Sequence, residues 1–317
     1  MDTQQIARQT QFPYLQENWR RDFGARHDYV FLVYPGRDTD RQYFCSDEDW
    51  QRFLTQDRLV LVAGRITPGI TGASGLLLAT GVSAETFIRR QPELLPEILR
   101  QVNDWASDVE AHSIGLAGIM PSIIQKRSIP VGSLFVKGLM GSTWLIIREV
   151  ESLVSPPARI AIVGFGYLGG FVSSELERQG FIVVKIDKRK TTEDIQNLKS
   201  CELVIALTPA GDDMCEYYEV LRDSQCTQIL FDCHPVPSRS VVDSFTQLGI
   251  RVFQTTARAG GVVTMPPLPN FEAADIPGCL LDAIVRSQCS NNGDMTFQDF
   301  GHFASNVGIQ TPAIELV

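Results

Sequence analysis

The stretch from Ile160 to Gly170, I-A-I-V-G-F-G-Y-L-G-G, is a short apolar run that ends in glycines with the spacing G-x-G-x-x-G. In such a pattern Gly164 permits a tight turn from strand to helix. Gly166 lets the backbone approach a pyrophosphate without a Cβ in the way, and Gly169 lets the helix pack closely on the strand. The first helical turn then presents unpaired N–H groups to an anion. The stretch therefore predicts a dinucleotide-binding loop.

The segments on both sides support this interpretation. Arg159 to Val163 is almost wholly apolar, as expected for a strand buried on both faces of a parallel sheet. After the glycines, Phe171 to Gly180 has the pattern of an amphipathic helix that ends at a glycine, and Phe181 to Ile186 is a second apolar run. Asp187 follows, about 20 residues past the loop, where such folds bind the ribose hydroxyls of the adenosine.

The same region leaves both nicotinamide cofactors, NAD and NADP, open. A carboxylate at Asp187 repels a 2′-phosphate, which favours NAD. Lys188, Arg189 and Lys190 follow immediately, and a basic cluster at this place suits a 2′-phosphate. A solvated loop explains the same cluster equally well. The residues that we expect to bind the cofactor are Gly164, Phe165, Gly166, Tyr167, Leu168, Gly169, Asp187, Lys188, Arg189, Thr208, Pro209, Gly260 and Gly261.

Composition narrows the class of protein. The chain has 317 residues, of which 44% are hydrophobic, and a formal net charge of −9. Scattered basic residues on an anionic chain argue against nucleic acid as a partner. No apolar run is long enough for a membrane span and the N-terminus is polar, so we expect a cytoplasmic protein. The seven cysteines predict reduced thiols, and their spacings, even around His234, match no common zinc site, so no metal is expected.

Strand and helix patterns alternate along the whole chain. Before the glycine loop, strands are expected at 29–34, 42–45 and 59–65, and helices at 92–111 and 142–154. After Asp187, apolar runs at 203–207, 228–232 and 251–254 predict three further strands. Each of these strands ends in a loop, and loops at the carboxyl ends of parallel strands form the ligand crevice of such sheets.

We therefore expect an α/β protein built on a Rossmann-type, doubly wound parallel sheet, with a separate N-terminal α/β domain for the substrate. The Pro156-Pro157 pair marks the expected boundary. Residues 1–155 would form the substrate domain and residues 156–290 the NAD(P)-binding domain. The tail, residues 291–317, would pack back on the first domain. A homodimer is the default expectation for the assembly.

Several strings resemble the cyanobacterial long-chain acyl-[acyl-carrier-protein] reductases, which reduce acyl thioesters to aldehydes with a nicotinamide cofactor. They are the glycine loop, G-L-A-G-I-M-P-S-I-I at 115–124, K-G-L-M-G-S-T at 137–143, L-F-D-C-H-P-V-P at 230–237 and G-G-V-V at 260–263. The likeness covers about residues 81–285. It departs from the family at Phe165, which gives the shorter dehydrogenase form of the loop, and at the proline-rich segment 265–269.

The resemblance implies a catalytic cysteine at Cys279, in the helix that follows the G-G-V-V string. A thiolate that first takes the acyl group makes a thioester easier to reduce, and the start of a helix favours the thiolate. A small buried core residue is the alternative role for Cys279. His234, at a strand end, could transfer a proton or bond to loop backbone. Lys137 could bind a substrate carbonyl or carboxylate.

Three functions remain open on this sequence. The first is an NAD(P)-dependent oxidoreductase that reduces an acyl thioester through an acyl-enzyme at Cys279. The second is a dehydrogenase of a small alcohol or amine without covalent catalysis, on the two-domain plan of the shikimate and methylene-tetrahydrofolate dehydrogenases. The third is a nucleotide-binding protein that is not an enzyme. The partner would be a small molecule or an acyl thioester.

Overall fold

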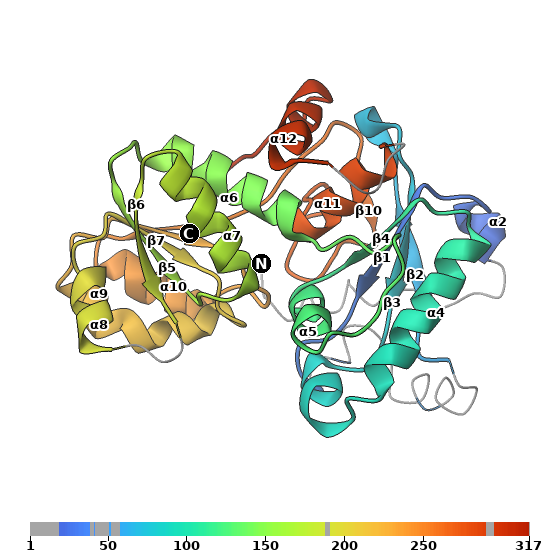
Figure 1. Ribbon diagram of the computed structural model, residues 1–317, viewed down its shortest axis with the longest axis horizontal. Coiled ribbons are helices and arrows are strands. Elements are labelled where there is room, and N and C mark those ends of the chain that lie inside the picture. The colour runs from blue at the N-terminus through green and yellow to red at the C-terminus, as the bar shows by residue number, and fades with distance from the viewer. Residues whose placement is uncertain are drawn as a thin grey trace. The chain divides into compact units, whose positions relative to one another are not determined.

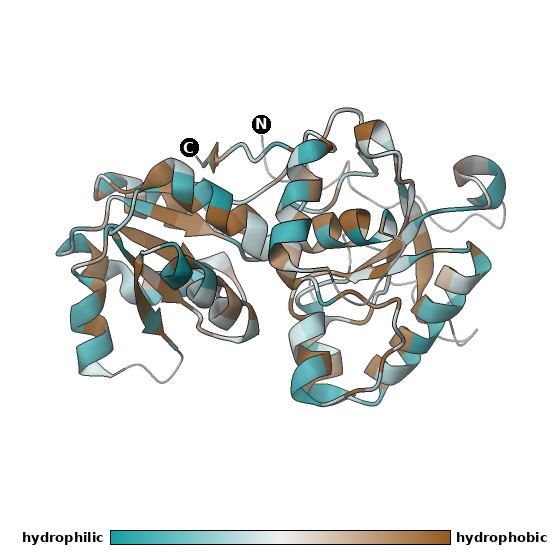
Figure 2. Ribbon diagram, turned by 45° about the horizontal axis from the view of Figure 1, so that its top comes forward, coloured by the Kyte–Doolittle hydropathy of each residue, from teal (hydrophilic) through white to brown (hydrophobic). Residues whose placement is uncertain are grey.

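The computed structural model describes residues 19–38, 41, 51, 58–187, 191–289 and 295–316 of the chain. The chain forms two compact α/β units, and each is discontinuous in sequence. The first unit contains Met1–Met140 and Arg258–Gln310, and the second contains Gly141–Ala257 and Thr311–Val317. Strands in both units are predominantly apolar along their length (Figure 2). The expected strand at 42–45 and the basic residues Lys188, Arg189 and Lys190 lie outside the described residues.

The second unit has the predicted Rossmann-type parallel sheet. Its strand order is β11-β9-β8-β7-β5-β6, and all neighbouring pairs are parallel except β11 with β9 (Figure 1). The order of the first five strands is thus 2-1-3-4-5, one of the two common doubly wound orders. The strands are β5 Arg159–Val163, β6 Ile182–Ile186, β7 Leu203–Ala206, β8 Gln228–Phe231, β9 Arg251–Gln254 and β11 Ile314–Glu315.

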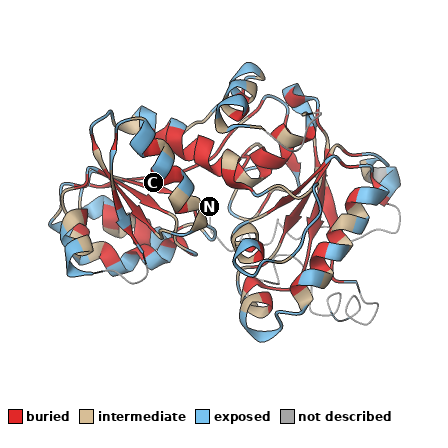
Figure 3. Cartoon of the chain, viewed as in Figure 1, coloured by how far each residue is buried: buried red, intermediate tan, exposed pale blue. Residues whose placement is uncertain are grey.

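Both faces of this sheet are covered, which explains why its strands show no polar alternation. Ala161 and Val163 of β5 belong to a buried cluster with residues of α8, α9 and α10 on one face. Ile162, with the opposite orientation, faces Gly169 of α7 on the other face. Figure 3 shows the result in the inner strands, of which β7 is buried along its whole length, whereas the edge strand β6 is partly exposed. The helices are α6 Leu139–Leu153, α7 Tyr167–Arg178, α8 Thr192–Leu198, α9 Tyr218–Arg222 and α10 Arg239–Gln247.

The first unit has a mixed sheet with the order β10-β2-β3-β1-β4. β1 is parallel to both β3 and β4, whereas β2 is antiparallel to β3 and to β10. The strands are β1 Tyr29–Val33, β2 Leu61–Ile66, β3 Gly75–Ala79, β4 Ser113–Leu116 and β10 Thr264–Met265. The helices are α2 Trp19–Phe23, α4 Leu94–Asp108, α5 Met120–Lys126, α11 Gly278–Ser287 and α12 Phe297–Asn306, with a π-helical turn at Thr86–Arg90.

Helix α11 packs directly on β4 and β1, and the close approach depends on Gly115. A Cβ at Gly115 would lie 2.8 Å from the Cβ of Ala283 and 2.7 Å from a ring atom of Phe31. Beside it, the hydroxyl of Ser113 donates a 2.8 Å hydrogen bond to the carbonyl of Ala283. The absence of a side chain at one strand position therefore lets the middle of α11 approach β4 closely.

The unit boundaries differ from those expected, because the segment from Arg258 to Gln310 belongs to the first unit. Met265 pairs with Arg65, so β10 extends the sheet of the first unit and carries α11 with it. The second unit begins at Gly141, inside α6, and the Pro156-Pro157 pair lies within it rather than at its edge. The tail divides too, since α12 belongs to the first unit and β11 to the second.

Candidate functional site

The glycine loop lies at the point where the strand order of the second unit reverses. β5 lies between β6 and β7, so the connection from β5 to β6 and the next one, to β7, run to opposite sides of β5. In open parallel sheets the two connections separate there and leave a crevice at the carboxyl ends of the strands. Residues 164–166 occupy this point, and α7 starts at Tyr167.

The backbone of the loop is anchored to β6. The N–H groups of Gly164 and Phe165 both donate to the carbonyl of Ile186, at 3.0 and 3.1 Å, and the N–H of Gly166 donates to Gly164 at 2.8 Å. These bonds use the donors that precede the helix. The N–H groups of the first turn of α7, at Tyr167, Leu168 and Gly169, have no backbone acceptor among the described residues. Such groups make a helix N-terminus a binding site for an anion.

The three glycines meet different surroundings. Gly164 has φ +89°, and a Cβ there would lie 2.6 Å from the carbonyl oxygen of Leu207. Gly166 is exposed, and the nearest atom to a Cβ on it is the carbonyl oxygen of Gly164, at 3.9 Å. A Cβ at Gly169 would lie 3.4 Å from the ring of Phe165 and 3.5 Å from Ile162. Only Gly164 is thus required by the fold, whereas Gly166 faces open space that a bound group could fill.

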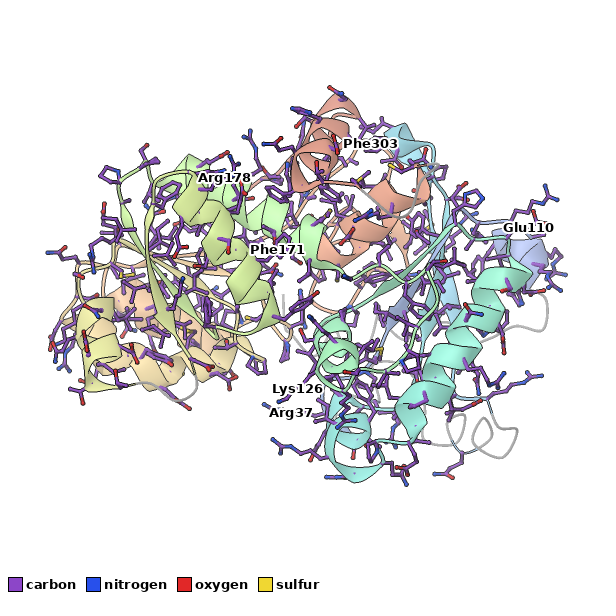
Figure 4. The ribbon with its side chains drawn as sticks, viewed as in Figure 1. Arg37, Glu110, Lys126, Phe171, Arg178 and Phe303 are labelled. Atoms are coloured by element: carbon purple, nitrogen blue, oxygen red, sulfur yellow. The ribbon has the colours of Figure 1, made fainter. Side chains whose placement is uncertain are left out.

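Residues next to the loop shape its other sides. Asp187 follows the carbonyl group that anchors the loop, and its side chain is exposed. The ammonium group of Lys185 lies 5.6 Å from the ring centroid of Phe165 and pairs with Glu177 at 2.8 Å. Phe171 and Arg178 lie on the exposed side of α7 (Figure 4). Next to the loop the described residues thus include an ion-paired lysine in β6 and, directly after β6, an exposed aspartate.

The loops after β7 and β8 hold each other in place. The hydroxyl of Thr208 donates to the carbonyl of Ala210 at 2.8 Å, and Pro209 is exposed. The N–H of Gly211 donates to the carbonyl of Pro235 at 2.9 Å, and a Cβ on Gly211 would lie 2.2 Å from the nitrogen of Pro237. His234 is exposed on the second of these loops, beside the buried Cys233.

Asp232 is a polar residue of this edge that the sequence analysis did not single out. It follows β8 directly, and its carboxylate accepts hydrogen bonds from the hydroxyls of Thr255, after β9, and Ser142, in α6. Burial raises the pKa of Asp232 to about 6, although both hydroxyls lower it. The signal that could have found it is the acidic residue at the end of an apolar strand, with Thr255 and Thr256 at the end of the next.

Cys279 lies in the first turn of α11, in the first unit. Gly138, with φ +66°, lies beside it, because a Cβ on Gly138 would be 3.5 Å from the Cβ of Cys279 and 3.7 Å from Pro121. Tyr34 is also near: its hydroxyl donates to Ala117 at 2.8 Å, and burial, with a smaller effect of the Cys279 thiol, raises its pKa. The cysteine thus lies where the 115–124 and 137–143 strings meet.

The other predicted residues are distributed over both units. Lys137 is exposed and precedes Gly138. Lys137 and Cys279 belong to the first unit, whereas His234 belongs to the second. The sequence placed Gly260 and Gly261 in the nucleotide domain, but the structure places them in the first unit. There the carbonyl of Gly260 accepts a 2.7 Å hydrogen bond from Ile70, and a Cβ on Gly261 would lie 3.0 Å from the Cα of Gly69. Close backbone packing explains both glycines.

The described residues contain neither a cluster of metal ligands nor a helix that could span a membrane. No cluster of three or more histidine, cysteine, aspartate or glutamate side chains in this part of the chain is arranged to hold a metal ion. Among the helices that the structure describes, none has the length and apolar character needed to cross a bilayer.

Comparison with solved structures finds dehydrogenases. An L-tryptophan dehydrogenase from Nostoc punctiforme is 11% identical, with a TM-score of 0.34 over 89% of this chain and 88% of that one. A glutamate dehydrogenase from Plasmodium falciparum is 10% identical, with a TM-score of 0.44 over 89% and 68%. A chorismate mutase/shikimate 5-dehydrogenase fusion protein from Clostridium acetobutylicum is 10% identical, with a TM-score of 0.37 over 89% and 97%. No family model and no curated protein matches the chain.

Proposed function

We propose that this chain is an NAD(P)-dependent oxidoreductase whose dinucleotide binds at the glycine loop of the second unit. The observation that carries the proposal is the combination of Gly166, which faces open space, with the N–H groups of Tyr167, Leu168 and Gly169, which have no backbone acceptor among the described residues. Both features lie at the reversal of strand order, where such sheets bind nucleotides. The pyrophosphate would accept hydrogen bonds from these N–H groups. A bound nicotinamide would supply hydride chemistry.

Asp187 leads us to propose NAD as the preferred cofactor. The carbonyl of the preceding residue, Ile186, holds the loop, so Asp187 would lie on the adenosine side of a pyrophosphate bound there. It can accept hydrogen bonds from ribose hydroxyls and repels a 2′-phosphate. We expect NAD to bind about tenfold more tightly than NADP, and Asp187→Ser to remove most of this preference.

Isothermal titration calorimetry with NAD, NADP and ADP-ribose tests both statements. Binding of at least one dinucleotide and of its matching ADP-ribose is the expected result. If none of these ligands binds at millimolar concentration, the proposed cofactor site is wrong. If Asp187→Ser still prefers NAD as strongly as the wild type, the role proposed for Asp187 is wrong, but the cofactor site is not affected. Binding without turnover of any carbonyl, alcohol or amine substrate would favour the non-catalytic nucleotide-binding protein.

A second candidate function is reduction of an acyl thioester, and the surroundings of Cys279 favour it. The thiol occupies the first turn of α11 and is partly exposed, beside Gly138 and near the exposed Lys137. The thiolate would attack the thioester carbonyl, forming a new S–C bond while the original one breaks, and the departing thiolate takes up a proton. Release of the aldehyde then needs hydride, which is the chemistry of a reduced nicotinamide.

Intact-protein mass spectrometry separates this candidate from a dehydrogenase without covalent catalysis. After incubation with an acyl-coenzyme A and no reduced cofactor, the wild type should gain the mass of one acyl group. Cys279→Ala should gain none, whereas Cys289→Ala should behave as the wild type, because Cys289 is equally part-exposed but follows the other end of α11. An adduct that persists in Cys279→Ala would exclude Cys279 as the nucleophile, and the alcohol or amine dehydrogenase would then be favoured.

A further inference from the structure

Asp232 lies where three elements of the second unit meet. It follows β8, its partner Thr255 follows β9, and Ser142 lies in the first part of α6. Both hydroxyls are buried, with Thr255 3% and Ser142 7% exposed, whereas Asp232 itself is only half-buried. Hydrogen bonds from the two hydroxyls hold the carboxylate from its buried side. The two hydroxyls therefore fix the orientation of the carboxylate of a residue that keeps part of its surface exposed.

The chemistry of this group limits what can bind to it. An ionised carboxylate has only acceptor sites, about four in all, and the two hydroxyls occupy two of them. The remaining sites match an N–H or O–H donor. A neutral primary amide offers two N–H donors and fits, whereas a ligand carboxylate at the same place would be repelled.

The position of Asp232 along the sheet edge indicates which donor it meets. Asp187, the glycine loop, Thr208 and Asp232 follow β6, β5, β7 and β8, which are consecutive neighbours in the sheet. At about 4.8 Å between strands, Asp187 and Asp232 are about 14 Å apart along this edge. A dinucleotide with its pyrophosphate over β5 and its adenosine at Asp187 directs its other end towards β7 and β8.

We propose that Asp232 is a positioning residue that accepts a hydrogen bond from the carboxamide N–H of the nicotinamide ring. The proposal rests on the proposed function. It specifies in addition that the dinucleotide would bind with its adenosine near β6 and its nicotinamide near β8. Ser142 and Thr255 keep the carboxylate in one orientation, so it would hold the amide of a bound ring in one orientation.

Calorimetric titration of three ligands tests the assignment at a pH of about 8, where Asp232 is ionised. The ligands are NAD, nicotinic acid adenine dinucleotide and ADP-ribose, or their 2′-phosphates if the wild type binds only those. Nicotinic acid adenine dinucleotide replaces the carboxamide by a carboxylate, and ADP-ribose lacks the ring. The proteins are the wild type, Asp232→Asn and the control Asp223→Asn. Asp223 precedes β8, at the opposite edge of the sheet, and is exposed.

The wild type and Asp223→Asn should prefer NAD to nicotinic acid adenine dinucleotide by at least about tenfold. In Asp232→Asn this ratio should fall to near one, while the affinity for ADP-ribose stays the same. An unchanged ratio would show that Asp232 does not face the ring, and an equal loss for all three ligands would show a purely structural role. Failure of the wild type to bind even ADP-ribose would instead remove the proposed function itself, and the assignment with it.

Discussion

Gly166→Ala is expected to weaken dinucleotide binding strongly and to change the stability of the folded protein little. A Cβ at Gly166 meets no atom closer than the carbonyl oxygen of Gly164, at 3.9 Å, and φ at this residue is negative, −107°. The same Cβ would project into the space that a pyrophosphate needs to reach the first turn of α7. We expect a loss in affinity of about a hundredfold, which corresponds to about 2.7 kcal/mol.

Two other glycines of the loop provide matched controls. Gly170→Ala adds a methyl group that meets nothing within 4 Å, so binding and melting temperature should both stay near those of the wild type. Gly164→Ala places a Cβ 2.6 Å from the carbonyl oxygen of Leu207 at φ +89°, so the melting temperature itself should fall. Calorimetric binding and thermal denaturation together distinguish these results. If Gly166→Ala binds as tightly as Gly170→Ala, no pyrophosphate approaches this loop.

Glu149→Gln is expected to make the protein more stable at alkaline pH and to remove much of its pH dependence. The Glu149 side chain, in α6, is 0% exposed, and neither carboxylate oxygen has a hydrogen-bond partner among the described residues. Burial raises its pKa to about 8, from an ordinary value of about 4.5. The folded state therefore retains a proton that the unfolded state releases between these two values.

The sign of the effect follows from proton linkage. The contribution of Glu149 to stability is complete below a pH of about 4.5 and is lost as the pH rises through about 8. Within this range the free energy of unfolding of the wild type should fall by up to about 1.4 kcal/mol per pH unit relative to Glu149→Gln. Denaturant unfolding at several pH values measures the difference. Glu151→Gln, an exposed change on the same helix, should show the same pH dependence of the free energy of unfolding as the wild type. If Glu149→Gln also shows the pH dependence of the wild type, the prediction is wrong.

The sequence predicts the first strands and helix of the second unit well because their signals are local. The strand before Gly164, the turn, the helix that starts at Tyr167 and the strand that ends at Ile186 are all confirmed within a few residues. By contrast, β3 was not predicted, although Leu76, Leu77 and Leu78 form an apolar run between glycines. This run carries the same signal as the predicted strand at 203–207, a short apolar run between turn residues, so β3 could have been predicted from the sequence.

The unit boundary could not be predicted, because it depends on contacts between distant parts of the chain. Pro156 and Pro157 form a clear local break, but the pairing of Met265 with Arg65 decides which unit carries α11. The glycines at 260 and 261 are a related case. The sequence places them in a strand-end loop that binds the cofactor, whereas in the structure Gly260 lies against Ile70 and Gly261 against Gly69.

Asp232 shows the corresponding limit for the candidate site. The sequence shows Asp232 at the end of an apolar strand, but nearby His234 has an ordinary pKa close to neutral and is the more typical proton-transfer residue. The sequence therefore favours His234. The hydroxyls that make Asp232 distinctive come from Ser142 and Thr255, about 90 residues before it and 23 after it in the chain. Only the fold brings such a trio together.

Both sheets take their last strand from late in the chain, and this has a consequence during synthesis. β2 pairs with β10, about 200 residues further on, and β9 pairs with β11, near residue 315. At a translation rate of about 5–20 residues per second, β10 would be synthesised roughly 10–40 s after β2, and the outer edge of β2 would be unpaired during this time. An open strand edge can pair with other nascent chains. The synthesis of Thr264 and Met265 therefore ends the interval in which Arg65 and Ile66 lack their strand partner.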